Sequence, residues 1–332
     1  MKTVMKTRIL TLSLLILLTL TAISCNQEVI FYDIAREVKL DNAEINGNVY
    51  SIVPLAGKLY VQNGDIYEKE KPKDAHGWKR IEKPAEAGNI IRLASDGTYL
   101  YALDNGKTVW ARSAGVTAWK KITDNVTSLF DNQVMDDSNF TTAGRSAYIT
   151  ILSENQSDPA YVQQEVKLLN GEATPSTVTD PGINSVVEKK DYIKAAASDG
   201  TVTVFSSEAS ICAQGTTLYR AAKNASKVEY KTQGGEWTEG GTLKAGALSI
   251  CPYGTDKILV GTAKGYEICS IDAAGVPGNG IESETNADSS FGTRAVITIK
   301  AFGTSVYTGV VSENSSEYSK LWGYFGNNWN YE

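Results

Sequence analysis

The sequence predicts an all-β protein built from one repeated unit, because a glycine turn between two short apolar strands recurs along most of the chain. The pattern is clearest in residues 210–216 and 249–255, which read SICAQGT and SICPYGT. The turn positions of the units are Gly57, Gly97, Gly144, Lys190, Gly215, Gly254 and Gly303. Their mean spacing is about 41 residues, which indicates a repeat architecture.

Two further markers keep the same spacing. A tryptophan closes several of the units, and these residues are Trp78, Trp119, Trp237 and Trp329. A Ser-Glu-Asn triplet starts nine residues after the turn glycine in two units, and the two copies are Ser153-Glu154-Asn155 and Ser312-Glu313-Asn314. Three features in one register favour a genuine repeat over chance similarity.

A unit of about 40 residues with several short strands is typical of a β-propeller blade. One small twisted sheet cannot bury both of its faces, whereas radial stacking lets neighbouring sheets cover each other. We therefore predict a single β-propeller domain over residues 45–332, most simply with seven blades, although six or eight also fit the spacing. Within this domain Asn63-Gly64 predicts a hairpin. The fourth unit is short and is expected to lack an outer strand, and the tryptophans are expected to pack between blades.

The start of the chain has the features of a secretory signal over residues 1–24. Lys2, Lys6 and Arg8 precede an apolar run over residues 9–23. This run is shorter than the ~20 residues that a helix needs to span a bilayer, which favours a cleaved signal over a membrane anchor.

The end of this signal, Ala22-Ile23-Ser24-Cys25, resembles the lipobox of bacterial lipoproteins. That family prefers Leu where this chain has Ala22. The resemblance implies that Cys25 carries the lipid, that the mature chain begins there, and that residues 25–44 form a tether. Within the tether, residues 29–32 (VIFY) are a candidate strand for closing the last blade. Asn26 is not the aspartate that retains many lipoproteins at the inner membrane, so we expect an exported protein anchored in the outer membrane.

Residues 95–110, SDGTYLYALDNGKTVW, resemble the repeat of quinoprotein-type propellers, in which D-G-x-x-Y-A-x-D is followed by G-K and Trp. They are also similar to an Asp-box, S-x-D-x-G-x-T-W, through Asp104, Gly106 and Thr108. Both resemblances cover one blade well and the others loosely. They imply a propeller fold. A scaffold role in the cell envelope is a further implication, because propeller lipoproteins of this class include an outer-membrane assembly scaffold.

Charge and composition exclude several classes of function. The net charge of −6 becomes about −9 when residues 1–24 and their three basic side chains are removed, which argues against a nucleic-acid partner. Apart from Cys25 the cysteines are Cys212, Cys251 and Cys269, and none forms a CxxC pair. We therefore predict reduced, buried thiols and no zinc site. Asp131, Asp136, Asp137 and Asn139 lack the spacing of a calcium loop, so no metal or cofactor is predicted.

No catalytic signature is visible. The single histidine, His76, lies in a polar turn, so a serine or cysteine nucleophile has no base and we expect no triad chemistry. We predict a non-enzymatic module that binds a protein partner in the envelope or the environment through loops on a rigid scaffold. The expected contact regions are the loops at Ser153, Glu154, Asn155, Ser312, Glu313 and Asn314 and the insertion at 278–290. A sialidase-like or lyase-like carbohydrate-active enzyme, and a propeller that binds glycans without turnover, remain the alternatives.

Overall fold

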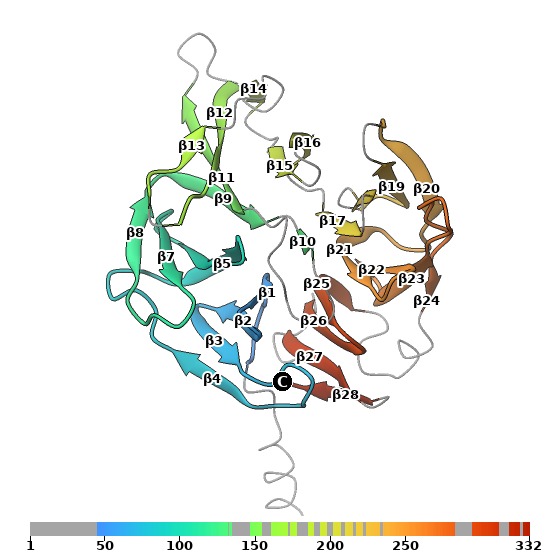
Figure 1. The fold of residues 1–332 in the computed structure, drawn as a ribbon, viewed down its shortest axis with the longest axis horizontal. Coiled ribbons are helices and arrows are strands. Elements are labelled where there is room, and N and C mark those ends of the chain that lie inside the picture. Colours follow the sequence, from blue (N-terminus) through green and yellow to red (C-terminus); the bar gives the residue numbers. More distant parts are fainter. Residues whose placement is uncertain are drawn as a thin grey trace, which may run out of the picture. The chain divides into compact units, whose positions relative to one another are not determined.

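The computed structural model describes residues 45–131, 133–134, 147–154, 161–171, 173–177, 185–188, 193–197, 202–206, 210–214, 217–221, 224–232, 235–282, 294–311, 319–325 and 328–332. The chain divides into two compact units, Met1–Asn42 and Ala43–Glu332, and all of these residues belong to the second. Their regular structure consists of β-strands (Figure 1). Cys25 and residues 29–32 therefore lie outside the described residues.

The strands at both ends of the described chain form regular antiparallel sheets in which consecutive strands are neighbours. The first sheet contains β1 (Ile52–Leu55), β2 (Lys58–Asn63), β3 (Asp65–Lys69) and β4 (Trp78–Ile81). The second contains β5 (Ile90–Ser95), β6 (Tyr99–Asp104), β7 (Val109–Ser113) and β8 (Lys120–Thr123). Two later sheets repeat this order: β21 (Ala247–Tyr253), β22 (Lys257–Thr262), β23 (Tyr266–Ser270) and β24 (Ile281–Glu282), then β25 (Ala295–Phe302), β26 (Ser305–Val311), β27 (Lys320–Phe325) and β28 (Asn328–Tyr331).

The sheets in the middle of the chain are less regular. One sheet has the order β13-β12-β11-β9 with β14 also paired to β12, and its strands are β9 (Val126–Asp131), β11 (Ala147–Glu154), β12 (Tyr161–Leu168), β13 (Ser176–Thr177) and β14 (Ser185–Glu188). A two-stranded sheet contains β15 (Ile193–Ala197) and β16 (Val202–Ser206). The next has the order β10-β17-β18-β19-β20, and its strands are β10 (Gln133–Val134), β17 (Ser210–Gln214), β18 (Thr217–Ala221), β19 (Lys227–Thr232) and β20 (Thr238–Thr242).

Four of the predicted turn glycines lie between the first two strands of their sheets, and Gly144 and Gly215 lie outside the described residues. Gly57, Gly97, Gly254 and Gly303 have φ values of 77°, 90°, 60° and 57°. Glycine adopts this left-handed conformation without the steric cost that a Cβ brings, which explains why it recurs at these turns. The all-β class and the repeated hairpin are thus confirmed.

The fourth unit differs from its prediction. The proposed turn at Lys190 lies outside the described residues, and the strands that flank it, β14 and β15, belong to different sheets. The hairpin of this unit pairs Ala197 with Val202, so residues 198–201 connect its two strands. These residues read SDGT, the same letters as residues 95–98.

The core lies between neighbouring sheets, as radial stacking requires. Buried residues of the first and second sheets form one cluster, which includes Leu55, Ile66 and Leu93. A separate cluster joins the first sheet to the last through Leu59, Trp78, Tyr307 and Leu321. These two sheets, blue and red in Figure 1, are neighbours although they come from opposite ends of the described chain. Among the described residues, the last sheet takes its four strands from Ala295 to Tyr331. Residues 29–32 lie outside the described residues, so the closing strand stays a prediction.

Three of the closing tryptophans lie between sheets, as predicted. Trp78 packs edge-on against Tyr307 of the last sheet. The Trp119 indole donates to the carbonyl oxygen of Glu82, which follows the first sheet, at 2.9 Å. Trp329 contacts Tyr266 of the preceding sheet with ring centroids 5.9 Å apart. Their role in the described structure is to join sheets, which fits the structural interpretation of these residues.

Candidate functional site

The predicted contact loops are only partly described. Ser153 and Glu154 are the last residues of β11 and pair with Gln163 and Val162 of β12, so they belong to a strand and not to a loop. β11 has 8 residues, which is longer than the second strands of the regular sheets, and so it includes Ser153 and Glu154. Asn155 and the triplet at 312–314 lie outside the described residues. Both triplets stand at the point where the second strand of a sheet leads to the third.

The carboxylates of the Asp-box-like segment are used inside the fold. Asp104 is buried, accepts the Thr108 N–H at 3.0 Å and accepts the Trp110 indole N–H at 3.0 Å. Asp96 accepts the N–H of Thr98 at 2.8 Å and the hydroxyl of Tyr101 at 2.6 Å. Both oxygens of each carboxylate thus accept hydrogen bonds from within the same sheet, which indicates a structural use of these side chains.

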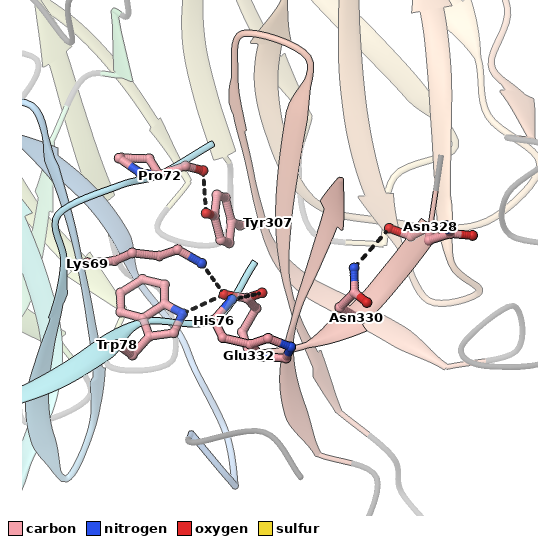
Figure 2. A network of polar contacts seen from close by, with 8 residues as sticks. All are labelled: Lys69, Pro72, His76, Trp78, Tyr307, Asn328, Asn330 and Glu332. Carbon is pink, nitrogen blue, oxygen red and sulfur yellow. Dashed lines mark hydrogen bonds and ion pairs between the residues drawn. The ribbon is translucent and has the colours of Figure 1, made fainter. Parts of the chain in front are cut away.

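A buried network joins the first sheet to the last (Figure 2). The Lys69 ammonium forms an ion pair with the Glu332 carboxylate, and both side chains are at most 1% exposed. Glu332 also accepts the Trp78 indole N–H at 2.8 Å and the His76 backbone N–H at 2.9 Å. We call Lys69, Trp78 and Glu332 the buried clamp. Its charges are paired and fully enclosed, which indicates a structural role.

The histidine and the cysteines agree with their predictions. His76 has an exposed side chain, and its φ of 58° places it in a turn. Cys212, Cys251 and Cys269 are free and buried. Burial, with a smaller contribution from Glu267, raises the pKa of Cys269 to about 12, so the thiol stays protonated at neutral pH. Among the described residues, no group of three or more His, Cys, Asp or Glu side chains is arranged to hold a metal ion.

An open cleft of about 450 Å³ lies between the first and second sheets, and sequence reasoning missed it. It is lined by Asn48, Tyr50, Gln62, Asn63, Gly64, Asp65, Asn89, Ile90 and Ile91, and we call it the amide cleft. Its floor is fixed by two backbone hydrogen bonds between Gly64 and Ile90, of 2.8 and 3.2 Å. The residues come from three segments that are separated in sequence, 48–50, 62–65 and 89–91, and the Asn and Gly residues there are ordinary turn residues by sequence.

The amide side chains of the cleft fall into two groups. Gln62 is buried and bonded at both ends, because it accepts the Tyr50 N–H at 3.3 Å and donates to the Ile91 carbonyl at 2.8 Å. The side-chain amides of Asn63 and Asn89 form no hydrogen bond to the part of the chain that the structure describes. Each therefore presents an acceptor oxygen and two donor hydrogens to the cleft.

Tyr50 stands beside these amides with its ring 40% exposed. The Asn48 amide donates to its hydroxyl at 3.0 Å, and the Arg92 guanidinium lies 5.2 Å from its ring centroid. Arg92 in turn donates to the Tyr50 carbonyl at 2.8 Å. The ring is thus held in place by a hydrogen bond and a cation–π contact.

A second cleft, of about 320 Å³, opens elsewhere between the same two sheets. Its polar side chains bond mainly to each other. Lys58 donates to Glu68 at 3.2 Å, and the Arg112 guanidinium lies 5.6 Å from the ring of Tyr60 and 5.1 Å from that of Trp119. We call it the charged cleft, and its internal pairing makes it the weaker candidate for a ligand.

Comparison with known proteins gives the family. Residues 2–214 match the TP013X lipoprotein family, which is more than half of the chain. The chain belongs to this family. It also resembles an uncharacterized lipoprotein of Treponema pallidum (strain Nichols), with 31% identity over 99 residues. That match covers 30% of this chain and 26% of the relative, so the chain spans about a quarter of the relative's length.

Solved structures support the fold of this TP013X-family lipoprotein. A streptogramin B lyase aligns with a TM-score of 0.52 and 14% identity, over 88% of this chain and 96% of that one. The virginiamycin B lyase of Staphylococcus aureus aligns with a TM-score of 0.50 and 13% identity, over 85% and 96%. At this identity the likeness shows only the fold, which is propeller-like and built from repeated antiparallel sheets. Within the described residues, no helix has the length and apolarity needed to cross a membrane.

Proposed function

We propose that this lipoprotein is an exported binding module of the cell envelope, held to the membrane by acyl chains on Cys25, with a seven-bladed β-propeller that recognises a partner without turnover. The observation that carries the proposal is the internal use of reactive groups in the described residues. The carboxylates of Asp96, Asp104 and Glu332 and the thiols of the buried cysteines serve the fold. Family membership supports the lipid anchor.

The seven-blade arrangement is supported by the sheets and by their contacts. The described strands form seven sheets, and the last sheet packs against the first through the buried clamp. Such contact between the ends of the described chain is what a circular arrangement of blades requires. A rigid scaffold of this kind displays its loops in fixed positions, which favours recognition.

Lipid attachment is tested by Cys25→Ala. The wild type should incorporate radiolabelled palmitate and sediment with membranes, because two or more acyl chains give stable attachment. The variant should lose the label and appear in the soluble fraction. Retention of the variant on membranes after high-salt and carbonate washes would overturn the anchor.

The partner surface is proposed to include the Ser-Glu-Asn segments at 153–155, where β11 ends, and at 312–314. A photo-reactive amino acid placed at Glu313 in the intact lipoprotein should cross-link to one defined partner in living cells. The same probe at exposed Lys79, on the outer strand β4, is the matched control. Equal cross-linking patterns from both positions would refute the loop assignment.

A sialidase-like or lyase-like carbohydrate-active enzyme is the second candidate, because residues 95–110 are similar to an Asp-box, a repeat that sialidases share. The purified mature lipoprotein should leave neutral and acidic oligosaccharides intact after prolonged incubation, as followed by mass spectrometry. New fragments, or an unsaturated product detected by its ultraviolet absorbance, would show that the protein is an enzyme and would overturn the binding proposal.

A further inference from the structure

We infer that the amide cleft is a binding site for an uncharged sugar, a neutral hexose or N-acetylhexosamine unit of a glycan. This inference is independent of the proposed protein-binding loops, because none of the cleft residues belongs to them. It rests on four properties of the described cleft: its preformed floor, its free amides, its neutral charge and its exposed apolar groups.

The floor of the cleft is preformed. Gly64 and Ile90 exchange two backbone hydrogen bonds across the junction of the first and second sheets. Gln62 ties the segment around Tyr50 to Ile91. A ligand therefore meets groups that are already in position, which lowers the entropy lost on binding. The volume of about 450 Å³ falls within the range of small-ligand pockets.

The free polar groups suit hydroxyl ligands. The Asn63 and Asn89 amides each offer both a donor and an acceptor, and no described residue engages them. A sugar hydroxyl also donates and accepts, so neighbouring hydroxyls on one ring pair with both ends of one amide. The Asn63 amide lies against Gly47, where a Cβ would come within 3.1 Å of its oxygen, so a larger residue there would disturb the amide.

The lining of the cleft contains one charged side chain, Asp65. The one carboxylate in its lining, Asp65, accepts an ion pair from Arg80 at 2.8 Å and lies 3.6 Å from the Lys83 ammonium. Arg92 is committed to the Tyr50 carbonyl and ring. Because the lining offers no positive side chain and its one carboxylate is already paired, a charged ligand would lose hydration without gaining a free opposite charge in the lining, which is costly. An uncharged ligand is therefore favoured.

The apolar groups are few and adjacent to the amides. Tyr50 and Ile91 are each 40% exposed, and both line the cleft. A sugar ring has an apolar face of C–H groups that packs on an aromatic ring, with hydroxyls at its edge. An extended peptide needs several apolar pockets for its side chains, and the described lining supplies only one small patch.

The test uses the mature lipoprotein in micelles of a detergent without a sugar headgroup. It is applied to an array of neutral oligosaccharides (glucose, galactose, mannose and N-acetylglucosamine oligomers), with sialylated and uronic acid oligosaccharides and uncharged peptides on the same surface. Binding to at least one neutral oligosaccharide is expected, with an apparent affinity that does not change between low and high salt. Binding only to acidic sugars or peptides, or to nothing, overturns the inference.

The variants assign any binding to the cleft. Tyr50→Ala, and Asn63→Ala combined with Asn89→Ala, should each weaken the affinity for the neutral oligosaccharide by about tenfold or more. Asn330→Ala is the matched control, because this exposed amide donates within its own strand to the Asn328 carbonyl. It should leave binding unchanged. Equal binding by all variants, with unfolding midpoints like that of the wild type, would place the sugar elsewhere and overturn the assignment.

Discussion

The first sheet packs against a neighbour on each side, and the two junctions differ in how they treat polar groups. At the junction with the last sheet, charges and aromatic rings fill the space, and Lys69 and Glu332 are enclosed. At the junction with the second sheet, an apolar cluster is present as well, but the edge is left open and lined with free amides. The first junction is therefore built for cohesion, whereas the second leaves polar groups available to a ligand.

The difference follows from which groups each junction can satisfy internally. In the buried clamp the Glu332 carboxylate receives an ammonium, an indole N–H and a backbone N–H. The Lys69 ammonium also lies 5.0 to 5.4 Å from the rings of Trp78, Tyr307 and Phe325. In the amide cleft only Gln62 is satisfied at both ends. The side of the first sheet that faces the last sheet thus serves stability, whereas the side that faces the second sheet leaves groups free for recognition.

The largest effect is expected from Glu332→Ala. The substitution leaves the Lys69 charge buried without a partner, which costs about 3–5 kcal/mol of unfolding free energy. Equilibrium urea denaturation of the mature protein measures it. The combined change Lys69→Met and Glu332→Leu should recover part of this loss, since it removes both buried charges.

The matched control is Glu70→Ala in the same sheet. Glu70 is 54% exposed and lies 3.6 Å from Lys58 and Lys79. Its loss should cost less than about 0.5 kcal/mol, as is usual for exposed ion pairs. Similar losses for Glu332→Ala and Glu70→Ala would show that the clamp does not hold the first and last sheets together.

A smaller effect is expected from Tyr101→Phe, which probes the next junction along the chain. The Tyr101 hydroxyl donates to Asp96 at 2.6 Å and accepts the buried Gly171 N–H at 2.8 Å. Burial, and then the bond to Asp96, raises the pKa of Tyr101. Removing the hydroxyl leaves the Gly171 N–H without an acceptor and should cost about 1–3 kcal/mol. Tyr99→Phe is the control, because no described residue bonds to its hydroxyl. Thermal unfolding should show a clear loss of stability for Tyr101→Phe and little change for Tyr99→Phe, and equal losses would contradict the role of the Tyr101 hydroxyl.

The pH dependence of stability provides a test of the buried cysteines. The pKa of Cys269 is about 12 in the folded protein, against about 8.5 in an unfolded chain. Between these values the unfolded chain releases this proton and the folded one keeps it, so the contribution of Cys269 to stability is lost as pH rises from about 8.5. Between pH 8 and pH 10, the unfolding free energy should decrease more for the wild type than for Cys269→Ala. Parallel slopes would contradict the burial of this thiol.

The repeat could be predicted because its turns and strand ends are chemically conspicuous. Glycine adopts a positive φ at the lowest steric cost, so Gly57, Gly97, Gly254 and Gly303 marked the hairpins directly. The fourth unit was misread because Lys190 was matched to the spacing, while the SDGT sequence at 198–201 carried the stronger signal. The parallel pairing of Gln133–Val134 with Cys212–Ala213 had no local signal, because a contact between residues so far apart depends on the assembled fold.

The candidate site was much harder to predict than the fold. Asn48, Gln62, Asn63 and Asn89 are separated in sequence and look like turn formers, and only the junction of two sheets brings them together. The sequence did contain a weak signal, a concentration of Asn, Gln and Tyr over residues 46–63. Which of these amides are engaged and which are free depends on side-chain geometry, which spacing alone does not reveal.

The smallest effect on stability is expected inside the amide cleft, where free and bonded amides can be compared directly. Asn63→Ala and Asn89→Ala remove amides that no described residue bonds, so each should change the unfolding free energy by less than about 0.5 kcal/mol. Gln62→Ala removes a buried amide with two bonds and should cost about 1–3 kcal/mol. Urea denaturation of the three variants separates the groups. A large loss for Asn63→Ala or Asn89→Ala would mean that these amides support the fold, and the contrast between a cohesive and a receptive side of the first sheet would disappear.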